Sequence, residues 1–484
     1  MKRLVLMIPF LLLNMAVGPC SSRNLGSVLD CGGNVTSSCP SQHCPPAGGA
    51  AVDGSQTDED SECLLPPACD VPVESAEPVR TIASCTGVDD TDVIQDAVTH
   101  ADEVRLPVGT CVVSGLVAEK KAIKLTGQGM GRSILKYLAR STDGAVFFSN
   151  GGRTVITDLT IDGSRGTGAE VAGLFIRPKT CVGPVFVARV EIRNTAFTAL
   201  LLSGAGSGNV NGIVDDGDGV GADGVWIFDT HLSNVGSGIN VGASSAPPIG
   251  HVRIHDNVVQ SDDVGIQLRG VHDGQVFHNL MTGGQSGVLL ESGDFGISLK
   301  DNDVLGCVRA GISFGGGGLN TGADIVVSAN RVSDCGDGVS VAHMTAGRFE
   351  NITIEDNEVT HNRHSGVIVE SGSHVMVTNN QLRGNTDAGL QFVLAPTLAG
   401  CGDRCTSVDD VLISHNVFRA EAALSSAGML IANAAARGIR VTTNDLRHDV
   451  PVPPYRPVDL SAAPAAAELI FDDNMGWPTA SAAP

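Results

Sequence analysis

Aromatic side chains and positive charge are both scarce in this chain of 484 residues. Aromatic residues make up 4% of it, with two tryptophans, which argues against a long groove that stacks sugar rings on aromatic side chains. The 31 Lys and Arg residues against 53 Asp and Glu give a formal net charge of −22. Such an acidic surface repels phosphate backbones, so nucleic-acid binding is excluded, and it disfavours polyanionic sugars unless a divalent cation bridges them.

Long apolar runs are also missing after the first residues. Met1-Lys2-Arg3 precedes an apolar stretch over 4–17, which is typical of an export signal over 1–19. No later stretch is long enough for a transmembrane helix. The signal ends in "VGPC", which resembles a bacterial lipoprotein signal with Cys20 as the lipidated residue, although Pro19 departs from the usual small residue. The alternative is ordinary secretion with Cys20 as a plain thiol.

The cysteine count favours the lipid. An exported chain with 13 cysteines holds an odd number, and assigning Cys20 to a lipid leaves 12 that can all pair. A single lipidated cysteine would anchor the protein to a membrane surface in the cell envelope without spanning it. Residues 20–78 are rich in Pro, Gly, Ser and acidic residues, and we interpret them as a flexible, cysteine-containing spacer.

From residue 79 to 475 the chain repeats a pattern, and a tail follows over 476–484. Each repeat has an alternating apolar stretch that ends in asparagine, and most have a glycine-led apolar stretch eight or nine residues later, such as "GIQL" or "GVLL". The steps between asparagines are 22, 23, 28, 27, 23, 36, 28 and 30 residues. Such a period is typical of a solenoid. The asparagines are Asn257, Asn279, Asn302, Asn330, Asn357, Asn380, Asn416, Asn444 and Asn474.

Stacked coils explain both features. One repeat is too small to bury its apolar face alone, whereas coils about 4.8 Å apart form continuous apolar ladders. Asparagines at a tight turn can bond the neighbouring backbone and stack amide on amide.

This pattern resembles the right-handed parallel β-helix of the pectin lyase-like superfamily, which includes pectate lyases and polygalacturonases. The block "DDTDVIQDAVTHADEVRLPVGTCVVSG" (89–115) is similar to the superfamily's N-terminal block, in which a short helix caps the first coil. Ile94, Ala97 and Val98 form the apolar side of that helix, and Asp90 or Thr91 is its N-cap. The resemblance implies an all-β fold, a parallel β-helix solenoid with a short N-terminal capping helix.

The register of the repeats predicts one disulfide independently of the family resemblance. Cys307 and Cys335 each lie five residues after a ladder asparagine, so they stack on adjacent coils within disulfide reach. We also predict Cys85–Cys111, which ties the cap helix to the first coil, and Cys401–Cys405 within "CGDRC". The alternative is that these cysteines are unpaired buried thiols.

Asp262 and Asp263, in "SDDVGIQLRG", resemble the aspartate pair of polygalacturonase-type hydrolases. Paired carboxylates can divide acid and base roles. The family's Asn-Thr-Asp and Gly-His-Gly stretches read Val235-Gly236-Ser237 and Gln285-Ser286-Gly287 here, so that activity does not carry over. The other interpretation is a turn in which the aspartates cap backbone N–H groups.

Stacking predicts further neighbours. Arg269 and Glu291 fall on adjacent coils, as do His364 and Asp387, which form either an acid–base pair or a surface salt bridge. The chain has seven lysines, mostly near its start, so a proton acceptor in the middle would be arginine or histidine. If the protein is an enzyme, its site is expected in the groove beside the Gly-led strands, around Asp263, Arg269, Glu291, Arg309 and His364.

One acidic, glycine-rich stretch, "VDDGDGVGADGVWIFD" (214–229), is a candidate Ca²⁺ loop with Asp216, Asp218 and Asp223 as ligands. Val220 stands where an EF-hand loop has a ligand, so a simple acidic loop is the alternative.

Two functions stay open. The first is an exported, surface-anchored protein that engages or degrades a polysaccharide as a lyase, hydrolase or epimerase, and the second is a non-catalytic structural or glycan-binding rod.

Overall fold

The computed structural model describes residues 78–119, 122–138, 143–150, 153–165, 170–177, 184–203, 223–242, 249–291, 293–315, 321–341, 348–393, 408–419, 427–432, 436–447, 456–460 and 469–476. The signal segment, nearly all of the spacer, Cys20, and the proposed Cys401–Cys405 pair lie outside these ranges. Within them, no helix is long and apolar enough to cross a membrane.

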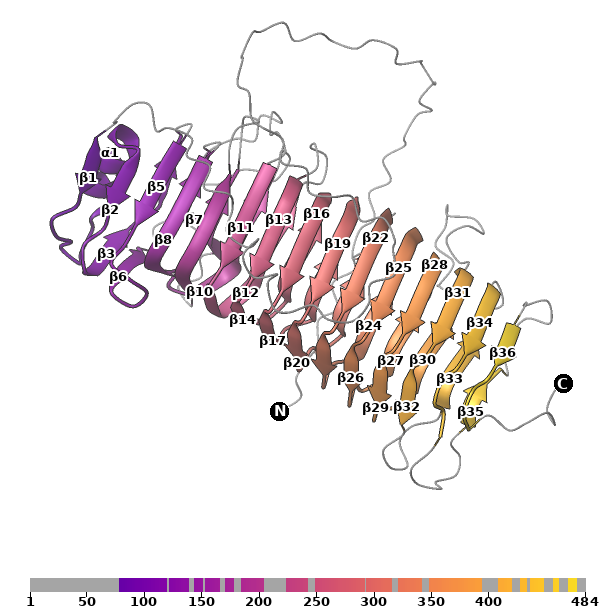
Figure 1. Ribbon diagram of the computed structural model, residues 1–484. Helices are drawn as coiled ribbons and strands as arrows, with labels where there is room; N and C mark the ends of the chain where they lie inside the picture. The colour runs from indigo at the N-terminus through magenta and orange to yellow at the C-terminus, as the bar shows by residue number, and fades with distance from the viewer. Residues whose placement is uncertain are drawn as a thin grey trace, which may run out of the picture. The chain divides into compact units, whose positions relative to one another are not determined.

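The described residues form a solenoid of parallel strands, stacked coil on coil along three faces (Figure 1). We call these faces sheets 1, 2 and 3. Sheet 1 contains β1 (Val79–Thr81), β2 (Glu103–Arg105), β5 (Ala122–Thr126), the first part of β8 (Arg153–Asp162) and of β10 (Val185–Ser203), β11 (Asp223–Phe228), β13 (Ile249–His255), β16 (Val271–Phe277), β19 (Asp294–Lys300), β22 (Thr321–Ser328), β25 (Arg348–Glu355), β28 (Gly372–Thr378), β31 (Val408–Ser414), β34 (Arg437–Thr442) and β36 (Leu469–Asp472).

Sheet 2 is the narrow face. It contains β3 (Gly109–Val113), β6 (Ser133–Tyr137), the end of β8, the middle of β10, the first part of β12 (His231–Gly242), β14 (Val258–Ser261), β17 (Leu280–Gly283), β20 (Asp303–Leu305), β23 (Arg331–Ser333), β26 (Glu358–Thr360), β29 (Gln381–Arg383) and β32 (Val417–Arg419).

Sheet 3 carries the Gly-led strands. It contains β4 (Leu116–Ala118), β7 (Asp143–Ser149), β9 (Glu170–Ile176), the ends of β10 and β12, β15 (Val264–Arg269), β18 (Ser286–Leu290), β21 (Ala310–Phe314), β24 (Asp337–Val341), β27 (Ser365–Val369), β30 (Ala388–Val393), β33 (Ala427–Ala432) and β35 (Arg456–Asp459). The predicted all-β parallel solenoid is confirmed.

Apolar ladders fill the interior. In sheet 3, Ile266, Val288, Ile312, Val339 and Val367 pair in register from coil to coil, and all are fully buried. Each such side chain contributes about 1.5–3 kcal/mol on leaving water. Because side chains alternate between the two faces of a strand, the residues between these buried ones lie on the outer face of sheet 3.

The nine asparagines form one continuous ladder. From Asn279 onward, the side-chain oxygen of each accepts the backbone N–H of the preceding ladder asparagine; Asn302 Oδ1, for example, accepts the N–H of Asn279 at 3.1 Å. The residue just before each asparagine has a positive φ, as at Asp256 (55°) and His278 (54°). Asp, Asn and His tolerate this left-handed conformation better than most residues, which explains their frequency at that corner.

The N-terminal end is capped by α1 (Thr91–His100), as predicted. Ile94, Ala97 and Val98 are its buried side, and Asp90 is its N-cap residue. The Asp90 side chain makes no helix-capping hydrogen bond and accepts the N–H of Val112 at 3.0 Å instead. Cys85 and Cys111 form a disulfide beside the helix, so the cap is tied covalently to β3.

A disulfide between Cys307 and Cys335 is absent, which corrects that prediction: both are buried free thiols. Their register is as expected, because Cys335 Sγ accepts the N–H of Cys307 at 3.2 Å. In register, the two Cβ atoms of stacked parallel residues lie about 4.8 Å apart, beyond the 3.5–4.5 Å that a disulfide needs. The Cys335 sulfur thus accepts a backbone N–H from the preceding coil. One coil later the side chain of Asn362 plays the same part, because its Oδ1 accepts the N–H of Cys335 at 3.0 Å.

Candidate functional site

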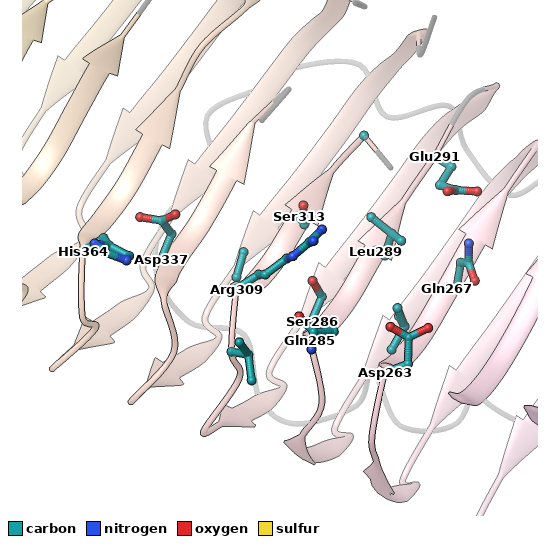
Figure 2. A pocket seen from close by; sticks show the side chains of 14 residues that line it. Asp263, Gln267, Gln285, Ser286, Leu289, Glu291, Arg309, Ser313, Asp337 and His364 are labelled. Atoms are coloured by element: carbon teal, nitrogen blue, oxygen red, sulfur yellow. The ribbon is translucent and has the colours of Figure 1, made fainter. Parts of the chain in front are cut away.

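A groove of about 700 Å³ lies on the outer side of sheet 3, across β15, β18, β21, β24 and β27 (Figure 2). Most of the side chains that line it can form hydrogen bonds. They are Asp263, Gln267, Gln285, Ser286, Glu291, Arg309, Ser313, Asp337 and His364, with Val264, Leu289, Val308, Ala310 and Gly315 as the apolar part.

One column of residues forms the lower edge of the groove. It follows the turns that enter sheet 3, two residues before each strand glycine, in the order Asp263, Gln285, Arg309, Gly336, His364, Asp387. Backbone bonds fix the stacking: the N–H of Arg309 donates to Gln285 O at 2.8 Å, and the N–H of Asp387 donates to His364 O at 3.0 Å. The structure thus brings Asp263, Arg309 and His364 to one groove, while their roles stay predictions.

The adjacent aspartates diverge. Asp263 faces the groove, and its carboxylate accepts from Ser237 Oγ at 3.3 Å. Asp262 forms an ion pair with Arg165, which lies 97 residues earlier in the chain. The backbone N–H groups of both aspartates donate to Gly236 O, at 3.0 and 2.8 Å. The two carboxylates therefore lie in different surroundings and do not form a facing acid–base pair.

At the upper edge, Arg269 and Glu291 are neighbours as predicted and form an ion pair. The Glu291 side chain is nearly buried, whereas that of Arg269 is 42% exposed. Behind them lies Asp294, fully buried, whose carboxylate accepts the N–H of Val271 and that of Glu291, both at 2.9 Å. Burial raises the pKa of Asp294 to about 8, and the negative charge of Glu291 acts in the same direction. The two hydrogen bonds and the positive charge of Arg269 lower this pKa but do not offset the effect of burial.

Arg309 lies in the middle of the groove. Its side chain extends over the floor toward Ser313, with Asp337 and His364 on one side and Gln285 and Ser286 on the other (Figure 2). Arg309 is exposed, and within the described ranges its guanidinium forms no salt bridge. A cation held without a counter-ion in a polar groove can receive a carboxylate in a bidentate arrangement.

His364 lies at the far end of the groove. Its Nδ1 is 3.1 Å from Asp387 Oδ2, so the predicted pair forms. Both side chains are more than half exposed, which is compatible with either of the two interpretations of the pair. Asp387 orients the ring, and this leaves Nε2 available to a ligand in the groove.

Asp337 is the groove residue that the sequence did not single out. Its carboxylate accepts the N–H of Ser365 at 3.0 Å, and the residue is 9% exposed, between Arg309 and His364. The equivalent positions on neighbouring coils hold Ala310 and Ser365, so nothing in the pattern marked this position as reaching the surface. Gln267 and Ser313 also come from the outward positions of sheet 3 and carried no separate signal.

No group of three or more metal-ligating side chains occurs in the described part of the chain. The proposed Ca²⁺ ligands Asp216 and Asp218 lie outside that part. Asp223 is the first residue of β11, and its side chain is not described.

A family model described as "Right handed beta helix region" matches residues 237–399 and 286–449, which include the groove and every ladder asparagine except Asn474. The described residues fold as a right-handed parallel β-helix.

Two solved structures resemble the β-helix protein in fold. The A-module of the mannuronan C-5 epimerase AlgE6 of Azotobacter vinelandii has a TM-score of 0.55 at 19% identity, and the match covers 82% of this chain and 96% of that module. Gene product 12 of bacteriophage phi29, in its pre-mature form, has a TM-score of 0.51 at 11% identity, with 80% and 50% covered. No curated protein matches this sequence. At these identities the likeness extends to the fold alone.

Proposed function

We propose that the groove on sheet 3 binds a segment of an acidic polysaccharide, with Arg309 as the residue that faces a sugar carboxylate. The observation that carries the proposal is the guanidinium of Arg309, which lies among hydrogen-bonding side chains of five consecutive coils and has no salt bridge in the described part of the chain. A groove open along the solenoid axis suits a linear polymer, and its polar floor suits sugar hydroxyl groups. The fold likeness to a mannuronan epimerase supports a uronate polymer as the first ligand to test.

The magnitude of this recognition is set by one charged pair. A charge-assisted hydrogen bond contributes about 1.5–3 kcal/mol, or roughly 10- to 150-fold in affinity. The formal charge of −22 opposes any polyanion. We therefore expect association with a uronate oligomer to become faster as salt screens this repulsion.

A second candidate function, proton transfer on a uronate, rests on the pairing of His364 with Asp387 in the groove that holds Arg309. With the sugar carboxylate against Arg309, the hydrogen on the adjacent carbon becomes more acidic. His364 Nε2 would take this proton. The electron pair then expels the oxygen on the next carbon, as in a lyase, or accepts a proton from the opposite face, as in an epimerase. Asp337 and Asp263 are the nearby carboxyl groups that could return a proton.

The sequence supports further parts of the proposal. We propose that the protein is exported and held at the cell envelope by a lipid on Cys20, with the spacer between anchor and groove. Ca²⁺ is proposed as an optional bridge between the acidic surface and a uronate, and its addition would then tighten binding.

Calorimetry with a hexamer of mannuronate tests the binding, with the carboxyl-reduced hexamer as the matched neutral ligand. We expect the wild type to prefer the acidic hexamer, and Arg309→Ala to lose about tenfold or more of that preference. Arg331→Ala is the control, because Arg331 is an exposed arginine paired with Asp303 and Glu358, each at 3.3 Å, and does not line the groove.

Failure of the wild type to bind either hexamer, with and without Ca²⁺, would leave the non-catalytic rod as the function. If binding occurs, absorbance of unsaturated products and the proportion of epimerised residues by NMR decide the second candidate. A His364→Gln variant that turns over as fast as the wild type would refute the role of His364.

A further inference from the structure

The coil that contains Cys335 is one residue shorter than its neighbours on the way into sheet 3. From the ladder asparagine to the first residue of the sheet 3 strand, the count is 310 − 302 = 8, then 337 − 330 = 7, then 365 − 357 = 8. The ladder and the strand pairing hold both ends in register, since Asn302 bonds Asn330 and Ala310 pairs with Asp337. The missing residue must therefore be absorbed within the turn at 335–336.

Shortening leaves two carbonyl groups of the preceding turn, those of Cys307 and Val308, without a backbone donor in the described residues. Gly336 passes close to the second of these: a Cβ at this position would lie 2.7 Å from Val308 O and would overlap Arg309 O. The turn that leads to Arg309 is thus bonded to the preceding coil, through Val308 N–H to Gly284 O at 2.8 Å, but only partly to the next one.

Arg363 fills this gap from two coils away. Its guanidinium Nη2 donates to Cys307 O and, at 3.5 Å, to Val308 O, while Nε donates to Cys335 O at 3.4 Å. One side chain therefore bridges the short coil and supplies donors to the two carbonyl groups, which no backbone N–H of the described residues reaches. A planar guanidinium with several donors can do this, whereas an ammonium on a flexible stem offers one point of attachment.

We propose that Arg363 is a positioning residue for Arg309, the groove cation. This inference rests on the proposed function of Arg309 for its functional consequence. Val308 is 56% exposed, and the peptide units just before Arg309 are held on the side of the preceding coil by the N–H groups of Val308 and Arg309, which donate to Gly284 O and Gln285 O, both at 2.8 Å. On the side of the next coil, the Arg363 side chain is the constraint, because it binds the carbonyl groups of Cys307 and Val308. Without that constraint the Arg309 side chain would sample more orientations over the groove, and its preference for a carboxylate would weaken.

The experiment compares Arg363→Ala, Arg363→Lys and the control Arg331→Ala in the full chain, with the mannuronate hexamer and its carboxyl-reduced counterpart as probes. We expect Arg363→Ala to lose roughly three- to tenfold of the preference for the acidic hexamer while its affinity for the neutral one changes less than twofold. Arg363→Lys should recover part of the preference, and Arg331→Ala should keep all of it. A merely structural role would lower both affinities together.

Hydrogen exchange without ligand gives a readout that does not depend on the proposed function. Peptides over 306–310 should exchange at least about tenfold faster in Arg363→Ala and be unchanged in Arg331→Ala. Unchanged exchange in Arg363→Ala overturns the positioning role. If exchange rises but Arg309→Ala itself has no effect on the preference, the positioning of the turn stands and the proposed function fails. If Arg309→Ala removes the preference and Arg363→Ala does not, the inference fails alone.

Discussion

Replacing Asn302 by alanine tests whether the asparagine ladder holds the solenoid together. Asn302 is 1% exposed. Its Oδ1 accepts from the backbone N and the Nδ2 of Asn279 at 3.1 and 3.0 Å, and its Nδ2 donates to Val276 O at 2.8 Å and to Asn330 Oδ1 at 2.9 Å. Alanine would leave the buried N–H of Asn279 and the carbonyl of Val276 without these partners.

Each buried polar group that loses its partner costs about 1–3 kcal/mol, so the free energy of unfolding should fall by about 3–5 kcal/mol. Asn240→Ala is the control, because Asn240 is a half-buried asparagine on the outer face of sheet 3 with a bond to Gln267 at 2.8 Å. It should cost less than about 1 kcal/mol. Urea unfolding followed by circular dichroism measures both. A difference between the two variants of less than 1 kcal/mol would refute the ladder as a stabilising element.

Three further variants test a glycine of sheet 3, the buried carboxyl group of Asp294 and the disulfide. Gly287→Ala should destabilise the protein by about 3 kcal/mol or more, because the new Cβ would overlap Val304 and lie 2.7 Å from Gly311 O. Gly306→Ala is the control: at φ 73° and with no atom within 4 Å of the new Cβ, it should cost about 1 kcal/mol. Equal midpoints of the two variants in thermal melts would contradict the prediction. The pKa of Asp294 is raised to about 8 in the folded state, so between about pH 4 and pH 8 the folded protein binds a proton there that the unfolded chain has lost. The contribution of protonated Asp294 to the free energy of unfolding is therefore complete below about pH 4. It is lost as the pH rises to 8, by up to about 1.4 kcal/mol per pH unit. Asp294→Asn should flatten that part of the stability profile measured by urea unfolding, and a variant profile parallel to the wild type would show that Asp294 stays ionised. Cys85→Ser with Cys111→Ser opens a loop of 26 residues and should cost about 3 kcal/mol, seen as faster hydrogen exchange in α1 than in β22; equal exchange in both would mean that the helix needs no covalent tie.

Much of the fold could be predicted because two residues recur at fixed places. The asparagine marks the corner before sheet 2 and the glycine marks the strand of sheet 3, so counting from either gives the register of Arg269 with Glu291 and of His364 with Asp387. The resemblance of residues 89–115 to the superfamily's N-terminal block implied the cap helix, and Ile94, Ala97 and Val98 marked its buried side.

Other features of the site could be seen only in the structure. Arg165 meets Asp262 across 97 residues, and coils of unequal length prevent such a pairing from being counted along the sequence. The disulfide between Cys307 and Cys335 failed although its register was right, because stacking in register also fixes Cβ atoms too far apart to be bonded. Asp337 escaped notice since its position holds alanine or serine in other coils, and Asp294 showed no sign of its burial.

The asparagine ladder runs unbroken although successive steps vary from 22 to 36 residues. Much of that variation falls where the chain passes from sheet 3 to sheet 1, as between β21, which carries part of the groove, and β22, or between β30 and β31, beyond the groove. The ladder is therefore independent of the length of this connection: residues can be inserted or removed at that corner without altering a single rung. Evolution or a designer can graft segments of different length there, while the scaffold is inherited intact.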